Sequence, residues 1–87
     1  MSRIEIEYCR RCKFLLRAAW LAQELLTSFE EELEEVALVP GSGGVFEVRL
    51  DGAVLFSNRS AGRLPEAREV KELVRDRVAP GRTIGHG

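Results

Sequence analysis

The sequence contains little of what a metal centre or a nucleic-acid-binding surface requires. Its 87 residues include two cysteines and one histidine, His86, so a single chain has too few soft ligands to close a tetrahedral zinc site. Lysine and arginine together number 13, against 14 for aspartate and glutamate, so no excess charge favours nucleic acid or acidic lipid as a partner. We expect no metal, no cofactor and no nucleic-acid partner.

Long apolar runs are also absent. No stretch approaches the roughly 20 apolar residues of a membrane-spanning helix, and residues 1–5 lack the apolar core of a signal peptide. We therefore expect a cytoplasmic protein without a membrane partner. The hydrophobic share of 45% and the charged share of 31% are typical of one soluble domain, residues 1–87, in which residues 81–87 form an aperiodic tail.

The two cysteines, Cys9 and Cys12, stand at the boundary between two hydrophobic patterns. Residues 3–8 alternate apolar and charged side chains, as in a strand, whereas apolar residues from Phe14 onward recur with helical spacing. The CxxC motif therefore lies at a strand-to-helix junction, where unpaired N–H groups and the helix dipole stabilise a thiolate. Two cysteines at this spacing can also form a disulfide with each other and exchange it with a partner.

Three basic residues, Arg10, Arg11 and Lys13, lie within or beside the motif. Positive charge close to a cysteine favours the thiolate, lowers the thiol pKa below about 8.5 and attracts an anionic partner. These residues predict a dithiol redox site at Cys9 and Cys12. Two alternatives stay open: the pair could be half of a zinc site shared by two chains, or a pair of structural thiols.

The run after the motif predicts a long helix with an acidic end at residues 30–35. Leu16 and Trp20 lie four apart on its otherwise polar side, so they should contact each other and not the core. We expect the tail to fold back so that Ile84 covers them; the alternative is a docking patch for a protein partner. The apolar stripe of this helix comprises Leu15, Ala18, Ala19, Ala22, Leu25, Leu26, Phe29 and Leu33.

A short strand at residues 35–39 should end at Pro40, and a glycine-rich loop follows it. Next, Asp51-Gly52 between two strand-like runs predicts a two-residue hairpin turn. Val54 and Phe56 should lie on the sheet face away from the core, where they could support a weak homodimer; otherwise we expect a monomer. The expected cross-strand pairs are Leu50 with Ala53, Val48 with Leu55, and Phe46 with Ser57.

A second helix should begin at Pro65 and Glu66 and end before Pro80. The order strand-helix-strand-strand-strand-helix predicts an α/β fold, a two-layer sandwich of a four-stranded mixed sheet with the helices on one face. The first two strands should be parallel and joined by the long helix. The CxxC then lies at the carboxyl edge of the first strand, where such sheets bind ligands.

In combination these features resemble the selenoprotein W, T and H family of small thioredoxin-like proteins. The resemblance extends from Ile4 to about Val78, and bacterial members carry CxxC where animal members carry C-x-x-selenocysteine. The matching residues are the strand-CxxC-helix opening, Gly-Val-Phe-Glu-Val at 44–48, Asp-Gly at 51–52 and Gly-Arg-Leu-Pro-Glu at 62–66.

The resemblance implies a thiol redox protein, linked to glutathione or thioredoxin, with Cys9 and Cys12 as the redox pair. It leaves open which thiol attacks, because thioredoxins use the first cysteine whereas the selenocysteine of the animal relatives stands at the position of Cys12. Where typical thioredoxins place a cis-proline opposite the motif, this chain has Gly43 and Gly44, which could let a substrate backbone approach the sulfurs. The predicted function is a thiol-disulfide oxidoreductase acting on thiol or disulfide proteins; the alternative is a redox-sensitive interaction module without turnover.

Overall fold

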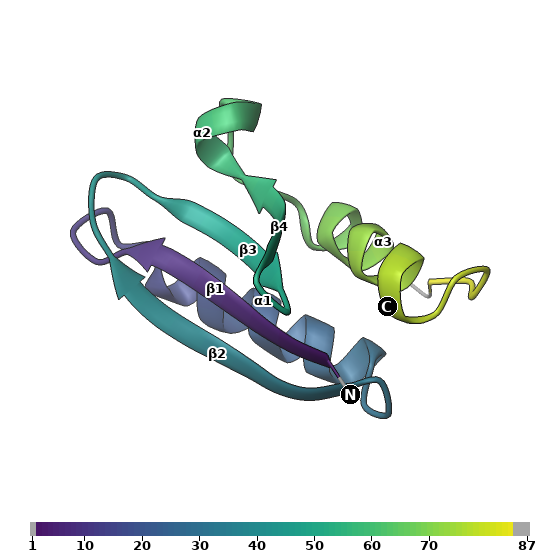
Figure 1. Ribbon diagram of the computed structural model, residues 1–87. Helices are drawn as coiled ribbons and strands as arrows, with labels where there is room; N and C mark the ends of the chain where they lie inside the picture. The colour runs from purple at the N-terminus through teal and green to yellow at the C-terminus, as the bar shows by residue number, and fades with distance from the viewer. Residues whose placement is uncertain (1, 85–87) are drawn as a thin grey trace.

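The computed structural model describes residues 2–84, which form a four-stranded mixed sheet with helices packed against it (Figure 1). The strand order is β2-β1-β3-β4, in which β1 and β2 are parallel and the other neighbouring strands are antiparallel. The elements are β1 (Ser2–Cys9), α1 (Leu15–Ser28), β2 (Leu33–Gly41), β3 (Phe46–Leu50), β4 (Ala53–Ser57), α2 (Asn58–Ala61) and α3 (Ala67–Val78). The predicted α/β fold is confirmed, and α2 is a short additional helix.

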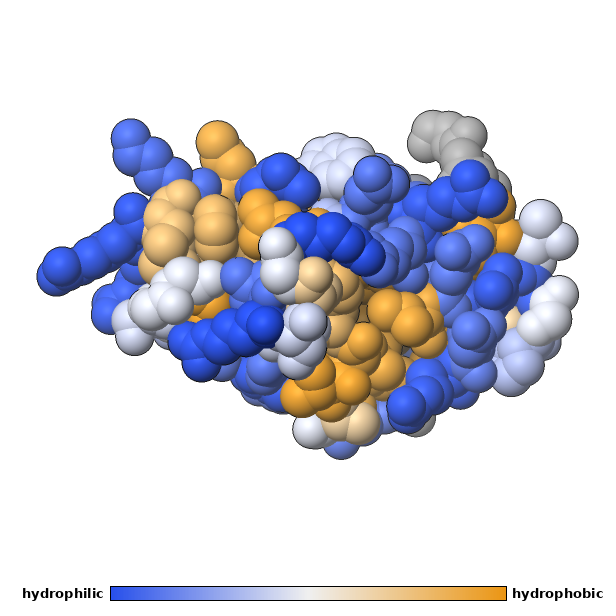
Figure 2. All heavy atoms as spheres, turned by 90° about the horizontal axis from the view of Figure 1, so that it is seen from above, coloured by the Kyte–Doolittle hydropathy of each residue, from blue (hydrophilic) through white to orange (hydrophobic). Residues whose placement is uncertain are grey.

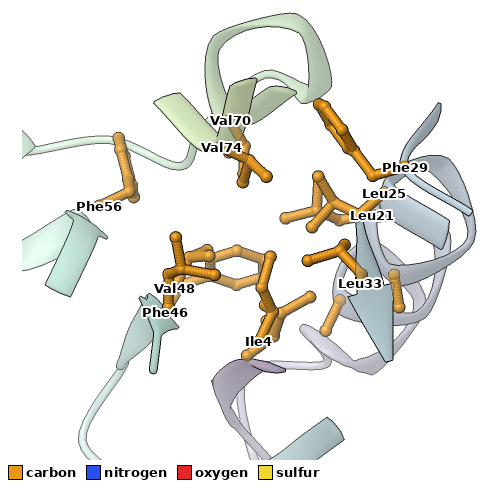
Figure 3. Packing of buried hydrophobic residues seen from close by; sticks show 14 of the residues in the cluster. Ile4, Leu21, Leu25, Phe29, Leu33, Phe46, Val48, Phe56, Val70 and Val74 are labelled. Atoms are coloured by element: carbon orange, nitrogen blue, oxygen red, sulfur yellow. The ribbon is translucent and has the colours of Figure 1, made fainter. Parts of the chain in front are cut away.

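The core lies between one face of the sheet and the two longer helices. Ile4 and Val48 project from the sheet and are fully buried, and they meet Leu25 from α1 and Val74 from α3 (Figure 3). Both helices therefore cover the same face, as predicted. Burial of these side chains supplies the main driving force for the fold, at roughly 1.5–3 kcal/mol for each fully buried aliphatic side chain.

Helix α1 ends earlier than its acidic run suggested. It stops at Ser28, and the N–H of Phe29 donates to the carbonyl of Leu25 at 2.9 Å. The next residues form a turn, and Leu33, expected in the helix, instead opens β2 as a buried residue. The helix stops there because further glutamates at its carboxyl end would oppose the dipole, and because the turn allows Leu33 to enter the core from the sheet.

The buried face of α1 is rotated relative to the predicted stripe. Leu21, which the stripe omitted, is buried, whereas Leu15 and Leu26, which it included, are exposed. The apolar residues of this helix cover more than one face, so periodicity alone did not identify the side that packs on the sheet.

Pro40 does not end the second strand, as the sequence suggested. Strand β2 continues to Gly41, and Pro40 lies opposite Tyr8 in the parallel pair. The prediction was wrong because β2 is an edge strand, and an edge strand tolerates a residue that has no N–H.

The hairpin turn between β3 and β4 is confirmed. Asp51 and Gly52 have φ values of 48° and 87°, the left-handed conformations that a type I′ turn requires, and Leu50 pairs with Ala53 as expected. The N–H of Arg3 donates to Oδ1 of Asp51 at 2.9 Å, which ties the turn to the start of β1.

Beyond the first pair, the hairpin register differs from the prediction. A bulge shifts the pairing, so Val48 lies opposite Phe56 instead of Leu55, and Ser57 lies opposite Glu47 instead of Phe46. The shift turns Phe56 into the core, where it is buried. Of the two apolar residues suggested for a homodimer interface, Phe56 is therefore buried and only Val54 remains exposed.

Helix α3 follows its predicted bounds closely. It begins at Ala67, after Pro65 and Glu66, and its fully buried residues Val70 and Val74 face the core. Within residues 2–84, no helix is long and apolar enough to span a membrane.

Candidate functional site

The two cysteines lie where β1 gives way to the turn before α1, as the sequence predicted. Cys9 is the last residue of β1, and its N–H donates to the carbonyl oxygen of Val45 at 2.8 Å. Cys12 lies in the turn, and the structure joins the two residues in a disulfide with a Cα–Cα distance of 5.4 Å. The motif is thus anchored through its first cysteine to the sheet, while the second lies on the connecting turn.

The motif precedes the first turn of α1 and does not occupy it. Helix α1 begins at Leu15, and Lys13 between Cys12 and the helix has a left-handed φ of 58°. Phe14 at the N-cap position makes no side-chain capping bond, so no side chain neutralises the exposed N–H groups of this helix start. The electropositive surroundings of the cysteines therefore come from the three basic residues around them as much as from the helix.

The two cysteines differ sharply in exposure. The residue Cys9 is 2% exposed, whereas Cys12 belongs to the exposed turn. A thiol or thiolate from another molecule therefore reaches the Cys12 sulfur more readily than the Cys9 sulfur. Sequence reasoning left the roles of the two cysteines open, and the structure adds that Cys12 is the more exposed of the two.

A pocket of about 360 Å³ lies beside the disulfide. Cys9, Arg10 and Arg11 line it, together with Gly41 at the end of β2 and Ser42 and Gly43 of the loop that follows. The structure thus brings Gly43 to the cysteine site, whereas Gly44 is not among the lining residues.

Gly41 is a site residue that sequence reasoning missed. A Cβ at this position would lie 2.6 Å from Oε2 of Glu7 and 2.8 Å from Cγ1 of Val45, so glycine is needed for the close approach of β2 to its neighbours. Its position directly after Pro40 at the start of a glycine-rich loop was the available signal.

The glycine loop is held in place by α2, whose role the sequence did not suggest. Asn58 accepts a hydrogen bond from the Phe46 N–H at 2.8 Å and donates one to the Gly44 carbonyl at 2.7 Å. Arg59 donates to the Gly43 carbonyl at 3.4 Å. Two consecutive side chains therefore fix the wall of the pocket that faces the cysteines.

Leu16 and Trp20 lie outside the core, as predicted, but they are exposed and Ile84 does not cover them. Leu16 is 82% exposed and Trp20 is 52% exposed. Ile84 is buried in the main core, so the expectation that it folds over these two residues is wrong. Trp20 lines a second pocket of about 360 Å³ together with Arg17, Leu21, Phe46, Pro65, Glu66 and Ala67.

The uncovered face of the sheet is charged and internally paired. Arg49 forms ion pairs with Glu5, Glu7 and Glu47 at 3.5, 3.0 and 2.7 Å. These hydrogen-bonded pairs raise the pKa of Arg49, and the bond to Glu47 contributes most. The Arg3 guanidinium, bonded to Glu5, holds the pKa of that carboxyl below its usual value. The charges on this face are thus largely engaged with one another.

Metal-ligating groups do not gather at the cysteines in the described part of the chain. Among residues 2–84, no three or more histidine, cysteine, aspartate or glutamate side chains are placed to hold one ion. His86 lies outside the described residues.

Comparison with known proteins identifies the family. A family model described as the Rdx family matches residues 3–76. The chain belongs to the Rdx family. Among solved structures, the selenoprotein W-related protein from Vibrio cholerae is 48% identical, with a TM-score of 0.86, over 88% of this chain and 96% of that chain. A protein from Bordetella parapertussis is 55% identical, with a TM-score of 0.84, over 86% of this chain and 95% of the other.

These neighbours confirm a selenoprotein W-related, thioredoxin-like protein of the Rdx family with a cysteine pair at disulfide distance. Curated relatives include migration and invasion enhancer 1 from Mus musculus, 31% identical over 74 residues. The match covers 83% of this chain and 61% of that relative, and the Bos taurus protein of the same name gives nearly the same figures. The chain thus spans about three fifths of the length of the curated relatives it matches.

Proposed function

We propose that this Rdx protein is a cytoplasmic thiol-disulfide oxidoreductase that uses Cys9 and Cys12 as a dithiol. The observation that carries the proposal is the asymmetry of the pair. An exposed Cys12 is bonded to a buried Cys9 at the end of a central strand, beside a pocket. Such an arrangement suits one thiol that meets the partner and a second that resolves the intermediate.

The two steps conserve atoms and electrons. In the reduced protein the Cys12 thiolate attacks one sulfur of a partner disulfide, which forms a mixed disulfide and releases the other partner sulfur as a thiolate. The Cys9 thiolate then attacks the Cys12 sulfur, which closes the intramolecular disulfide and releases the second partner thiolate. Two electrons pass from the protein to the partner, and solvent protonates the released thiolates.

The residues around the pair support the nucleophile in this mechanism. Arg10, Arg11 and Lys13 place positive charge beside Cys12 and stabilise its thiolate. Gly43 forms part of the opposite pocket wall, where a substrate backbone would approach. The substrates proposed are disulfide-bonded proteins or glutathione adducts, with a cellular thiol such as glutathione or thioredoxin as the electron donor.

Single serine variants test the assignment of roles. With a chromogenic disulfide, Cys9→Ser should accumulate a mixed disulfide on Cys12, detectable by intact mass, because the resolving thiol is absent. Cys12→Ser should form little adduct, because the remaining Cys9 is buried. Equal adduct formation in both variants would contradict the assigned roles, and failure of the wild-type protein to reduce any disulfide would contradict the function.

The pH dependence of alkylation provides an independent check. Peptide mapping of the reduced protein should show that Cys12 reacts with an apparent pKa below about 8.5. If both thiols titrate at or above that value, or react only after a chelator is added, the assignment should give way to structural or zinc-bound cysteines.

A second candidate function is a redox-sensitive interaction module. The exposure of Leu16 and Trp20 close to the cysteines favours it. In that case oxidation of the pair would alter binding of a protein partner without catalytic turnover. Multiple turnovers of a disulfide substrate with an added reductant distinguish the oxidoreductase from the module.

A further inference from the structure

The charges along α1 and its flanks are separated into two groups. Residues 8–23 contain Arg10, Arg11, Lys13 and Arg17 and no acidic residue, whereas residues 30–35 contain five glutamates. Helix α1 lies between the two groups and has 14 residues, a length of about 21 Å. Because the Debye length at physiological salt is about 8 Å, the acidic group screens the basic one little. Although the net charge of the chain is close to zero, the end of the molecule that holds the cysteines carries an excess of basic residues.

This positive end is not neutralised by ion pairs among residues 2–84. Arg10, Arg11 and Lys13 form none there, and Arg17 donates only a long hydrogen bond, at 3.4 Å, to the carbonyl of Pro65. The acidic end is partly paired, since Glu32 contacts Arg82 at 2.8 Å. One carboxylate, Glu66, lines the pocket beside Trp20 together with Arg17 and offsets part of its charge, so the positive charge is strongest around Cys12, at Arg10, Arg11 and Lys13.

Exposed apolar side chains accompany these charges. Leu16 and Trp20 project from the first two turns of α1, and the Trp20 side chain lines the second pocket beside Phe46 and Pro65. In the space-filling view, hydrophilic side chains extend from the end of the molecule that holds the loop after β1, and apolar atoms lie between them (Figure 2). Tryptophan and arginine together at a partly desolvated site are the residue types that dominate protein interfaces.

We propose that Arg11, Lys13, Leu16, Arg17 and Trp20 form a docking surface for an acidic segment of a partner protein. An apolar side chain of that segment enters the pocket beside Trp20, and carboxylates on either side of it meet the three basic residues. Because Cys12 stands between Arg11 and Lys13 in the chain, the segment brings its neighbouring disulfide to the exposed sulfur. This proposal names the kind of partner on which the thiol chemistry proposed above would act. Reduction of a docked partner depends on that proposed function, whereas binding of the acidic segment does not.

Binding can be measured without any redox step, because Trp20 is the only tryptophan in the chain. The probes are synthetic peptides in which serine replaces cysteine: one with four glutamates and a leucine, one with the leucine changed to glycine, and one with lysine in place of glutamate. The acidic leucine peptide should change Trp20 fluorescence and bind at least about tenfold more tightly than the lysine peptide at low salt. Equal affinities for the acidic and lysine peptides would overturn the proposal.

The kinetic test uses the same peptides with a cysteine disulfide-bonded to a chromogenic thiol. At low ionic strength the second-order rate constant for the acidic peptide should exceed that for the lysine peptide by about tenfold or more, and 0.5 M salt should remove most of the difference. A ratio near one at low salt, with all peptides reduced, would overturn docking and leave the oxidoreductase function intact. Selective binding of the acidic peptide without reduction would support docking and contradict the oxidoreductase function.

Matched charge variants locate the surface. Arg17→Glu should lower the rate for the acidic peptide by about fivefold or more and raise that for the lysine peptide. Arg77→Glu changes the net charge equally but lies in the last turn of α3, and it should change neither rate by more than about twofold. Trp20→Ala should remove the advantage of leucine over glycine in the peptide. Equal effects of the Arg17 and Arg77 variants, or tighter binding of a single-stranded oligonucleotide than of the acidic peptide, would overturn the assignment.

Discussion

Helices α1 and α3 pack on the same sheet face, but they carry their charges in opposite orders. Helix α3 has Glu69 in its first turn and Arg75 and Arg77 in its last turn, which is the arrangement that the helix dipole favours. Helix α1 has no acid in its first turn and no base in its last, and Arg17 occupies its start. Arg68 and Asp76 also lie in these turns, so the charges of α3 favour its dipole mainly at the carboxyl end, whereas Arg17 of α1 opposes the dipole of its own helix and adds to the positive potential at the cysteines.

The apolar residues of the two helices differ in the same sense. In α3 the valines Val70 and Val74 are fully buried, and no large apolar side chain of that helix is exposed. In α1 the first two turns leave Leu15, Leu16 and Trp20 exposed, and only the inner side reaches the core. The comparison indicates that the apolar residues of α3 serve packing on the sheet, whereas those of α1 serve both packing and an exposed surface next to the site.

The largest expected effect tests which side of α1 is structural. Leu25 is fully buried, so Leu25→Ala should lower the free energy of unfolding by about 2–5 kcal/mol. The same substitution at the neighbouring exposed residue, Leu26→Ala, should cost less than about 0.5 kcal/mol. Urea unfolding of both variants provides the measurement, and similar losses would show that the buried face has been assigned wrongly.

The next effect concerns the ion pair that joins the two helices. Lys71 of α3 is 5% exposed and its Nζ lies 2.7 Å from Oε1 of Glu24 on α1. Glu24→Gln should cost about 1–3 kcal/mol, because it leaves a buried ammonium without its carboxylate, although Glu24 keeps some contact with water. The double variant with leucine at both positions should recover most of the loss in thermal unfolding. A single variant as stable as wild type would mean that the helices are joined by apolar contacts alone.

A smaller effect, of opposite sign, separates stability from docking. Arg17→Glu places an acid in the first turn of α1, as in α3, and should raise the free energy of unfolding by about 0.3–1 kcal/mol at low salt. The uncharged control Arg17→Gln should give an intermediate value. Chemical denaturation at two salt concentrations measures the gain, and a destabilised variant would refute the statement that the charges of α1 oppose its dipole.

The smallest effect concerns the first turn of α3. Hydrogen bonds from Arg63 lower the pKa of Glu69. A lowered pKa in the folded state contributes stability above the unfolded value of about 4.3, and this contribution is lost as the pH falls through the folded pKa. At pH 7 the wild type should therefore have a higher free energy of unfolding than the Glu69→Gln variant, by less than the gain expected for Arg17→Glu. This difference should disappear below about pH 4. A difference that does not change with pH would assign another role to Glu69.

The sequence predicted the elements whose signals are local. The Asp51-Gly52 turn, the start of α3 after Pro65 and the strand-to-helix position of the cysteines each depend on a few adjacent residues, and all three are confirmed. The hairpin register failed because Leu55 and Phe56 are both apolar, so alternation alone does not say which one faces the core. A bulge settles that choice, and it depends on packing across the sheet.

For the candidate site, the sequence predicted only the residues that are contiguous in the chain. Cys9, Cys12 and the adjoining basic residues are contiguous, so the motif revealed them. Gly41, Asn58 and Arg59 contribute to the site through contacts between segments far apart in the sequence; the glycine-rich loop gave a weak signal for Gly41, and no local pattern marks the other two. The position of Leu16 and Trp20 outside the core was expected, whereas the burial of Ile84 in the core was not, because the tail has no periodicity from which its position could be inferred.

Strand β2 and strand β4 form the two edges of an open sheet, and each edge is interrupted. Pro40 removes an N–H from β2 near the cysteines, and the bulge breaks the regular pairing of β4. Unpaired sheet edges are templates on which further copies of a chain can add as extra strands, and prolines and bulges are the usual obstacles to such growth. The same proline that the sequence suggested as the end of a strand therefore helps to protect a concentrated protein against assembly into extended β-aggregates.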